Sequence, residues 1–148
     1  MNDMDTLYEI SSEPARLDID AIHAYLTRSY WSPGIPRDVV ARAVAHSLCF
    51  GAYLGAGGEQ VGFARVVTDH ATFAYLCDVY VLEKHQGRGL GKRLMRTFME
   101  HPAVAGARRV MLATRDAHGL YRQYGFVDTT GNVNLMEIVR PDIYQRRA

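Results

Sequence analysis

The sequence predicts one α/β domain over residues 1–148, with a mixed central sheet of about six to seven strands and about four flanking helices. Three observations support this prediction. The length of 148 residues is typical of a single domain. Hydrophobic residues make up 48% of the chain, which is enough to form a core and argues against disorder. Segments of strand composition also alternate with segments of helical periodicity along the chain.

The first part of the chain predicts a short edge strand at 8–10 and then two helices. Either Asp18 or Asp20 can cap the first helix. Its apolar face consists of Ile19, Ile22, Tyr25 and Leu26. The Pro/Gly-rich stretch SYWSPGIP ends this helix, and Pro36 suits the first residue of a second helix that runs to about residue 46.

The middle of the chain predicts three strands. Residues 48–54 and 60–68 flank the glycine-rich turn GAGG and predict a β-hairpin. Residues 72–82, TFAYLCDVYVL, are nearly all apolar or aromatic, which is typical of a central strand covered on both faces. Asp78 is the one residue that breaks this pattern.

The remaining segments predict two helices and three strands. The clearest helix runs from residue 89 to about 101, because its apolar and charged residues occupy opposite arcs. A strand at 107–114 and a short helix at about 117–124 follow. The stretches FVDTT and NVNLMEIV then predict two last strands around a Gly-Asn turn.

Composition excludes several classes of protein. The net charge of +1 argues against a general nucleic-acid or membrane binder. The sequence shows no signal peptide and no apolar run long enough to cross a bilayer, so we expect a cytoplasmic protein. Cys49 and Cys77 lie in apolar runs and are expected to be buried, reduced thiols. The six histidines lack metal-ligand spacing, so no metal is predicted.

The stretch QGRGLG, residues 86–91, is typical of a phosphate-binding loop. Its spacing fits neither the dinucleotide fingerprint nor the P-loop, because Lys92 stands at the third glycine position of the former and Arg93 replaces the magnesium-binding hydroxyl of the latter. It follows an apolar strand and opens a helix, where unpaired N–H groups bind phosphate. Gln86, Arg88, Lys92 and Arg93 could add side-chain donors. The sequence therefore predicts a pyrophosphate that is bound but not cleaved.

Two sequence blocks resemble the GNAT superfamily of N-acetyltransferases. Gln86-x-x-Gly89-x-Gly91 matches the family signature Q/R-x-x-G-x-G/A. Residues 114–127, TRDAHGLYRQYGFV, resemble the downstream block N-x-x-A-x-x-L-Y-x-K-x-G-F, with Thr114 in place of Asn and Gln123 in place of Lys. The two blocks span about residues 72 to 127. The resemblance implies a GNAT-like fold whose central sheet opens to bind acetyl-CoA as the acetyl donor.

The resemblance also implies roles for particular residues. Backbone groups of Val79, Tyr80 and Val81 would bind the pantetheine arm. The pyrophosphate would bind to the loop and the start of the helix, formed by Gln86, Gly87, Arg88, Gly89, Leu90, Gly91 and Lys92. Tyr121 would protonate the departing thiolate as a general acid. Tyr124, three residues further on, is expected to be a packing residue.

The general base and the acceptor site are less directly indicated. Asp78 is a carboxylate in an apolar strand beside the expected thioester, so it is either a general base or one half of a buried ion pair, for example with Arg65. A water relay is the alternative base. Asp116 and His118 are secondary candidates, and either could cap the helix that follows Arg115, which we favour for Asp116.

The loop between the first two helices offers an aromatic pair, Tyr30 and Trp31, which could shape an acceptor pocket or fill the edge of the core.

These observations together predict an N-acetyltransferase that moves an acetyl group directly from acetyl-CoA to an amine, without an acyl-enzyme. The acceptor can be a small molecule or a protein amine, and the resemblance allows for a homodimer. The alternative is a non-catalytic acyl-CoA-binding sensor or regulatory module.

Overall fold

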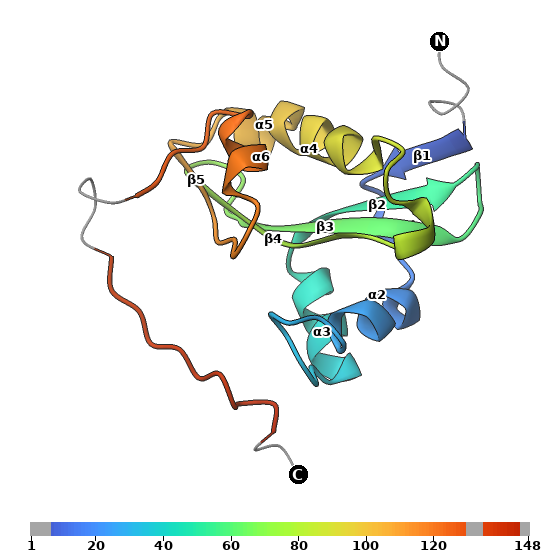
Figure 1. The fold of residues 1–148 in the computed structure, drawn as a ribbon, viewed down its shortest axis with the longest axis horizontal. Helices are drawn as coiled ribbons and strands as arrows, with labels where there is room; N and C mark the ends of the chain where they lie inside the picture. The colour runs from blue at the N-terminus through green and yellow to red at the C-terminus, as the bar shows by residue number, and fades with distance from the viewer. Residues whose placement is uncertain (1–6, 130–134, 146–148) are drawn as a thin grey trace.

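A five-stranded mixed sheet forms the centre of the protein, in a computed structural model that describes residues 7–129 and 135–145 (Figure 1). The strands lie side by side in chain order: β1 (Tyr8–Ser11), β2 (Leu48–Leu54), β3 (Gln60–Thr68), β4 (Phe73–Val81) and β5 (Arg109–Leu112). The first four are antiparallel to their neighbours, and β5 pairs with β4 in parallel. This arrangement confirms the α/β class and the hairpin expected around GAGG.

Helices cover both faces of the sheet (Figure 1). They are α2 (Ile19–Leu26), α3 (Arg37–Ala45), α4 (Leu90–Glu100), α5 (Pro102–Ala105) and α6 (His118–Arg122), with 3-10 turns η1 (Pro14–Arg16) and η2 (Glu83–His85). The Asp18 carboxylate accepts from the Ala21 N–H at 3.0 Å and caps α2. Pro36, the predicted first residue of the second helix, is the N-cap of α3, so the helix begins one residue later than predicted.

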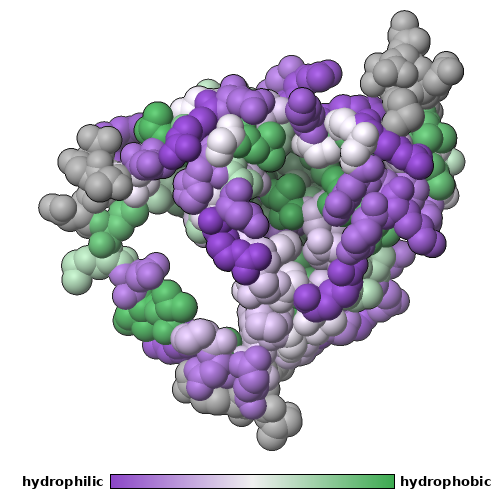
Figure 2. All heavy atoms as spheres, in the orientation of Figure 1, coloured by the Kyte–Doolittle hydropathy of each residue, from purple (hydrophilic) through white to green (hydrophobic). Residues whose placement is uncertain are grey.

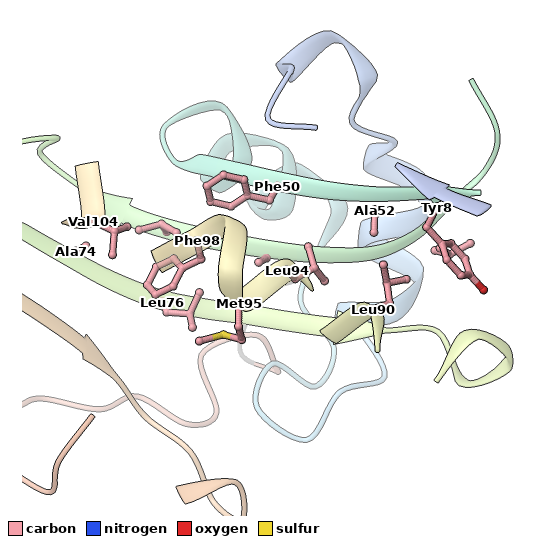
Figure 3. Close-up of a cluster of buried hydrophobic side chains, with 13 residues drawn as sticks. Tyr8, Phe50, Ala52, Ala74, Leu76, Leu90, Leu94, Met95, Phe98 and Val104 are labelled. Carbon is pink, nitrogen blue, oxygen red and sulfur yellow. The ribbon is translucent and has the colours of Figure 1, made fainter. Parts of the chain in front are cut away.

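Two hydrophobic clusters join the helices to the sheet. On one face, α4 places Leu90, Leu94, Met95 and Phe98 against Phe50, Ala52, Ala74 and Leu76 of the strands (Figure 3). On the other face, buried residues of α2 and α3 pack on Phe63 and Tyr80. Each of these helices has a single apolar stripe, and packing on one face of the sheet buries that stripe.

A β-bulge in β4 separates it from β5. Phe63 pairs with Tyr80 and Arg65 with Cys77, so two residues of β4, Asp78 and Val79, lie opposite one residue of β3. Asp78 has a positive φ of 54°. A bulge bends its strand, and β5 is in register with β4 only from Phe73 to Leu76. The two strands therefore diverge beyond the bulge.

Within the described residues, two details of the predicted architecture are wrong, the number of helices and the two last strands. The structure has five α-helices rather than about four, because Pro102 both ends α4 and begins α5. The strand predicted at 72–82 is β4, and it has a neighbour on each side, β3 and β5, as expected of a central strand. The two last strands do not form in the residues described: 126–129 and 135–139 carry no strand, and 130–134 lie outside the described residues.

The apolar residues of the C-terminal segment are exposed instead of paired. Leu135, Met136, Ile138 and Val139 are more than half exposed. Figure 1 shows this part of the chain running apart from the sheet. These residues pair with neither edge of the described sheet, and this accounts for the smaller strand number.

Candidate functional site

A groove runs along the glycine-rich loop between β4 and α4. It is lined by Tyr25, Trp31, Val79, Tyr80, Val81, His85, Gln86, Gly87, Gly89, Leu90 and Gly91. All the residues predicted to bind the cofactor line it except Arg88 and Lys92. The structure thus brings the end of β4 and the start of α4 to the two sides of one opening.

The glycines leave the backbone of this loop accessible. Gly87 and Gly89 have positive φ angles of 77° and 79°, a conformation that glycine adopts without strain. A Cβ at Gly87, Gly89 or Gly91 would meet no atom within 4 Å, so the backbone faces open space. Gly89 is the N-cap of the 11-residue α4 and gives it no side-chain cap. The N–H groups of the first helical turn can therefore bind an anion.

Most of the side chains expected to donate to phosphate contact the protein instead. The Gln86 Nε2 donates to the carbonyl of Val81 at 2.9 Å. Arg88 Nη1 donates to the hydroxyl of Tyr8 at 3.0 Å, and Arg93 Nη2 to the carbonyl of Tyr8 at 3.3 Å. Lys92 is exposed on the first turn of α4. In this loop the backbone, rather than the guanidinium groups, faces the groove.

The end of β4 presents backbone groups alternately to its two sides. The N–H of Leu82 donates to Val61 of β3 at 2.8 Å, so by alternation the groups of Val81 point to the opposite side, where the Val81 carbonyl accepts from Gln86. Those of Tyr80 face β3. Tyr80 itself lines the groove, and the role of its backbone toward the cofactor stays a prediction.

The far wall of the groove comes from α2. The rings of Tyr25 and Tyr80 stack with centroids 3.9 Å apart and planes 6° from parallel. Burial raises the pKa of both phenols, so both remain neutral. Arg28 lies over the other face of Tyr25 at 4.2 Å and pairs with Glu83 at 2.8 Å. The sequence analysis missed Tyr25 as a lining residue because it shares the apolar face of its helix, a pattern that core residues also show.

A second cavity, of about 590 Å³, lies between the diverging ends of β4 and β5. It is lined by Tyr30, Trp31, Ser32, Arg65, Tyr75, Leu76, Cys77, Asp78, Val79, Leu112, Ala113, Thr114, Arg115, Asp116, Ala117 and Tyr121. The structure thus brings the predicted catalytic pair and the predicted aromatic pair together. Trp31 and Val79 line both cavities, so the cavity and the groove meet at these two residues. Figure 2 shows hydrophobic residues at the floor of a hollow rimmed by hydrophilic side chains.

Asp78 forms a partly buried ion pair. Its Oδ2 accepts from Arg65 Nε at 2.6 Å, and its Oδ1 accepts from the Trp31 indole N–H at 2.9 Å. Burial would lower the pKa of Arg65, but the charge and hydrogen bond of Asp78, together with the nearby cysteines, outweigh it, and the pKa is raised. The sequence allows two roles for Asp78, a general base or one half of an ion pair with Arg65. The ion pair is present, and both carboxylate oxygens accept hydrogen bonds.

Tyr121 lies on α6 with its ring against Phe126, 6.0 Å between centroids. Burial, reinforced by the nearby Tyr30, raises its pKa, so the phenol keeps its proton at neutral pH. Tyr124 does not line the cavity that holds Tyr121, but lines a mainly apolar hollow at the outer edge of β5. The two tyrosines therefore face different surroundings, although they are three residues apart.

The rim of the second cavity is formed by aromatic and charged side chains. The guanidinium of Arg115 lies 3.8 Å from the ring centroid of Tyr30, whose ring meets Trp31 edge-on at 5.1 Å. Asp116 does not cap α6 as expected, because the N-cap is Ala117, whose side chain makes no hydrogen bond. The carboxylate of Asp116 instead lies 3.9 Å from the guanidinium of Arg115.

Two absences concern the described part of the chain. Within it, no group of three or more His, Cys, Asp or Glu residues is placed to hold a metal ion. Nor does it contain a helix with the length and apolar character required to cross a bilayer.

Comparison with known proteins gives consistent matches. The acetyltransferase (GNAT) family matches residues 4–126. The candidate acetyltransferase FG08082 of Gibberella zeae is 38% identical over 135 residues, covering 77% of this chain and 75% of that protein. The crystal structure of a candidate GNAT-family acetyltransferase from Xanthomonas campestris pv. campestris is 48% identical, with a TM-score of 0.87, covering 93% of this chain and 96% of that one. Glucosamine-6-phosphate N-acetyltransferase from Arabidopsis thaliana, at 14% identity, shares the fold with a TM-score of 0.62, covering 90% of this chain and 99% of its own.

Proposed function

The chain belongs to the acetyltransferase (GNAT) family and is an N-acetyltransferase, and from that premise we propose that its single domain transfers the acetyl group of acetyl-CoA directly to an amine. The observation that carries this proposal is the meeting of the groove and the second cavity at Trp31 and Val79. The groove suits a long, phosphate-bearing donor, and the cavity offers an acceptor access to its end. A direct transfer needs both ligands to meet at one point.

The groove holds the donor through backbone groups. Backbone groups of Val79, Tyr80 and Val81 bind the pantetheine arm, and the N–H groups of residues 87–91 bind the pyrophosphate at the start of α4. Lys92, exposed on the same turn, adds a positive charge. Acetyl-CoA supplies an activated thioester when bound, so the protein itself needs no nucleophile. The pKa of each cysteine supports this, because burial raises it to about 12 for Cys49 and about 11 for Cys77.

Tyr121 acts as the general acid in this proposal. The amine nitrogen forms a bond to the acetyl carbon, the carbon–sulfur bond breaks, and the sulfur takes the proton of the Tyr121 phenol. The raised pKa of Tyr121 keeps that proton in place until it is needed. The amine must also lose a proton, since a free lysine amine has a pKa of about 10.4. We assign this step to a water relay, with Asp78 as the other candidate, because both Asp78 oxygens already accept hydrogen bonds.

The cavity favours an acceptor with an apolar or planar body. Three tyrosines and one tryptophan line it, and its two buried charges, Arg65 and Asp78, neutralise each other. Tyr30 and Trp31 form the side through which the acceptor approaches.

A panel of amines tests the proposed function. Purified protein is incubated with acetyl-CoA and with small amines, amino acids, antibiotics or peptides, and free CoA thiol is measured. We expect thiol release that depends on an acceptor. Binding of acetyl-CoA without release on any acceptor would instead support a sensor of acyl-CoA.

A further inference from the structure

Tyr8 of β1 contacts the loop that begins α4. The side chain is buried, with 3% of its surface exposed. Its hydroxyl lies 2.7 Å from Nδ1 of His85 and 3.0 Å from Nη1 of Arg88, residues 77 and 80 positions away in the chain. Figure 3 shows Tyr8 at the end of the core cluster, beside Leu90. The hydroxyl group of Tyr8 therefore joins β1 to His85, which lines the groove.

The chemistry of these three groups favours one arrangement of their hydrogen bonds, in which the buried phenol hydrogen also has an acceptor. A guanidinium can only donate, so the phenol oxygen accepts from Arg88. The single phenol hydrogen is then directed to His85 Nδ1, which accepts it. An imidazole that accepts at Nδ1 carries its own proton on Nε2. In this arrangement Tyr8 favours the tautomer of His85 that carries its proton on Nε2.

We propose that His85 is a further cofactor-binding residue, whose Nε2–H donates to a phosphate oxygen of acetyl-CoA, and that Tyr8 is the positioning residue that orients it. His85 lines the groove together with Gly87 and Gly89, whose backbone faces the same opening. A hydrogen bond to an ionised phosphate is stronger than one between neutral groups. This inference rests on the proposed function, because it requires the groove to hold acetyl-CoA.

The contacts of Tyr8 also hold the imidazole ring in place before the ligand arrives. The rings of Tyr8 and His85 meet edge-to-face, with centroids 5.6 Å apart and planes at 88°. Arg93 of α4 donates to the carbonyl of Tyr8, so the loop and the helix are attached to the same residue of β1. A donor that is already oriented loses little freedom on binding, which increases affinity.

Two amide substitutions at His85 separate its two nitrogens. The amide of Asn reaches the position of Nδ1 but not that of Nε2, whereas the amide of Gln reaches the position of Nε2. We expect His85→Asn to weaken acetyl-CoA binding about tenfold by calorimetry. We expect His85→Gln to stay within about threefold of the wild type, because it keeps a donor in the groove.

Tyr8→Phe tests the positioning role. Removing the hydroxyl should weaken acetyl-CoA binding about threefold, because the imidazole remains but is no longer oriented. The double variant Tyr8→Phe/His85→Asn should bind no more weakly than His85→Asn alone, because Tyr8 acts through His85. Tyr53→Phe is the matched control: Tyr53 is equally buried at 3% exposure, and its hydroxyl has no hydrogen-bond partner.

S-acetyl-pantetheine, which lacks the phosphates, distinguishes this role from a general structural one. Its affinity, measured by competition, should be the same in the wild type and in all variants. Unchanged acetyl-CoA affinity in His85→Asn, an equal loss for both ligands, or additive losses in the double variant would each overturn the inference while leaving the proposed function intact. Failure of the wild type to bind acetyl-CoA would overturn the proposed function itself.

Discussion

The indole N–H of Trp31 donates to Asp78 at 2.9 Å and so joins the loop between α2 and α3 to the bulge of β4. The same carboxylate accepts from Arg65 of β3 at 2.6 Å. One side chain therefore connects three parts of the structure where the groove and the second cavity meet. This relationship gives Asp78 a structural role that can be separated from a catalytic one.

Replacing Asp78 with Asn should destabilise the protein. Arg65 would keep its buried position, at 19% side-chain exposure, without a counter-charge, and breaking such a pair costs about 3 kcal/mol or more. Asn tolerates the positive φ of 54° at this position. Urea unfolding would measure the change. Asp20→Asn is the control, because its pair with Arg37 is exposed and should contribute less than about 1 kcal/mol.

The Asp78→Asn variant also tests whether Asp78 is the general base. If Asp78 is structural and a water relay removes the proton, Asp78→Asn should retain measurable turnover under conditions where it remains folded. A loss of turnover of about 100-fold or more with unchanged stability would instead identify Asp78 as the base.

Replacing Tyr121 with Phe should lower kcat by about 100-fold or more, because a general acid contributes that much. The affinity for acetyl-CoA should hardly change, since Tyr121 lines the second cavity and not the groove. Steady-state kinetics and calorimetry would measure the two effects. Tyr124→Phe is the control and should retain full activity. An unchanged kcat in Tyr121→Phe would remove this residue from the mechanism.

Replacing Gly89 with Val should abolish acetyl-CoA binding while the protein stays folded. A β-branched residue is strained at a φ of 79°, so the loop must shift and its N–H groups lose their alignment. Gly57→Val is a closely matched control: Gly57 also has a φ of 79° and open space around it, but lies in the turn between β2 and β3. Both variants should lose about 1–3 kcal/mol of stability, and only Gly89→Val should lose binding. Normal affinity in Gly89→Val would contradict the phosphate assignment.

Stability should fall above pH 9. Burial raises the pKa of Cys49 from 9.0 to about 12 and that of Cys77 from 9.0 to about 11. Between these values the unfolded chain loses thiol protons that the folded protein keeps. Alkaline pH therefore favours unfolding, by up to about 1.4 kcal/mol per pH unit for each thiol. Urea unfolding at pH 7, 9 and 10 would measure the slope, and Cys49→Ala should make it shallower. An equal free energy of unfolding at pH 7 and at pH 10 would show that folding does not raise the pKa of the two thiols.

Features set by neighbouring residues in the sequence could be predicted. The cap at Asp18, the stop at Pro102 and the apolar stripe of α4 follow from local backbone geometry and helical periodicity. The glycine-rich loop was recognisable because a strand, a loop and a helix follow one another without interruption. The lining of the groove by this loop is a consequence of that order.

Contacts between distant segments could not be predicted. The hydroxyl of Tyr8 meets His85 and Arg88 only because β1 lies at one edge of the sheet and α4 packs across its face. From the sequence, Arg88 is expected to bind phosphate, because the neighbouring residues give no sign of its hydrogen bond to Tyr8. The bulge at Asp78 was likewise visible only as a polar residue in an apolar run.

The last part of the chain shows a different limit. NVNLMEIV has strand composition, but composition records only how well a residue fits a sheet and not whether an edge is available. Within the described residues, Ile138 and Val139 lie exposed and outside any strand.

Trp31 is the only tryptophan in the chain, and its indole lies where the groove meets the second cavity. The protein therefore contains a single tryptophan fluorophore at the junction of its two ligand sites, which can be excited separately from the nine tyrosines. Its emission should respond to the donor and to the acceptor in separate titrations, without any attached dye. Unknown acceptors could then be sought by optical titration before a reaction product has been identified.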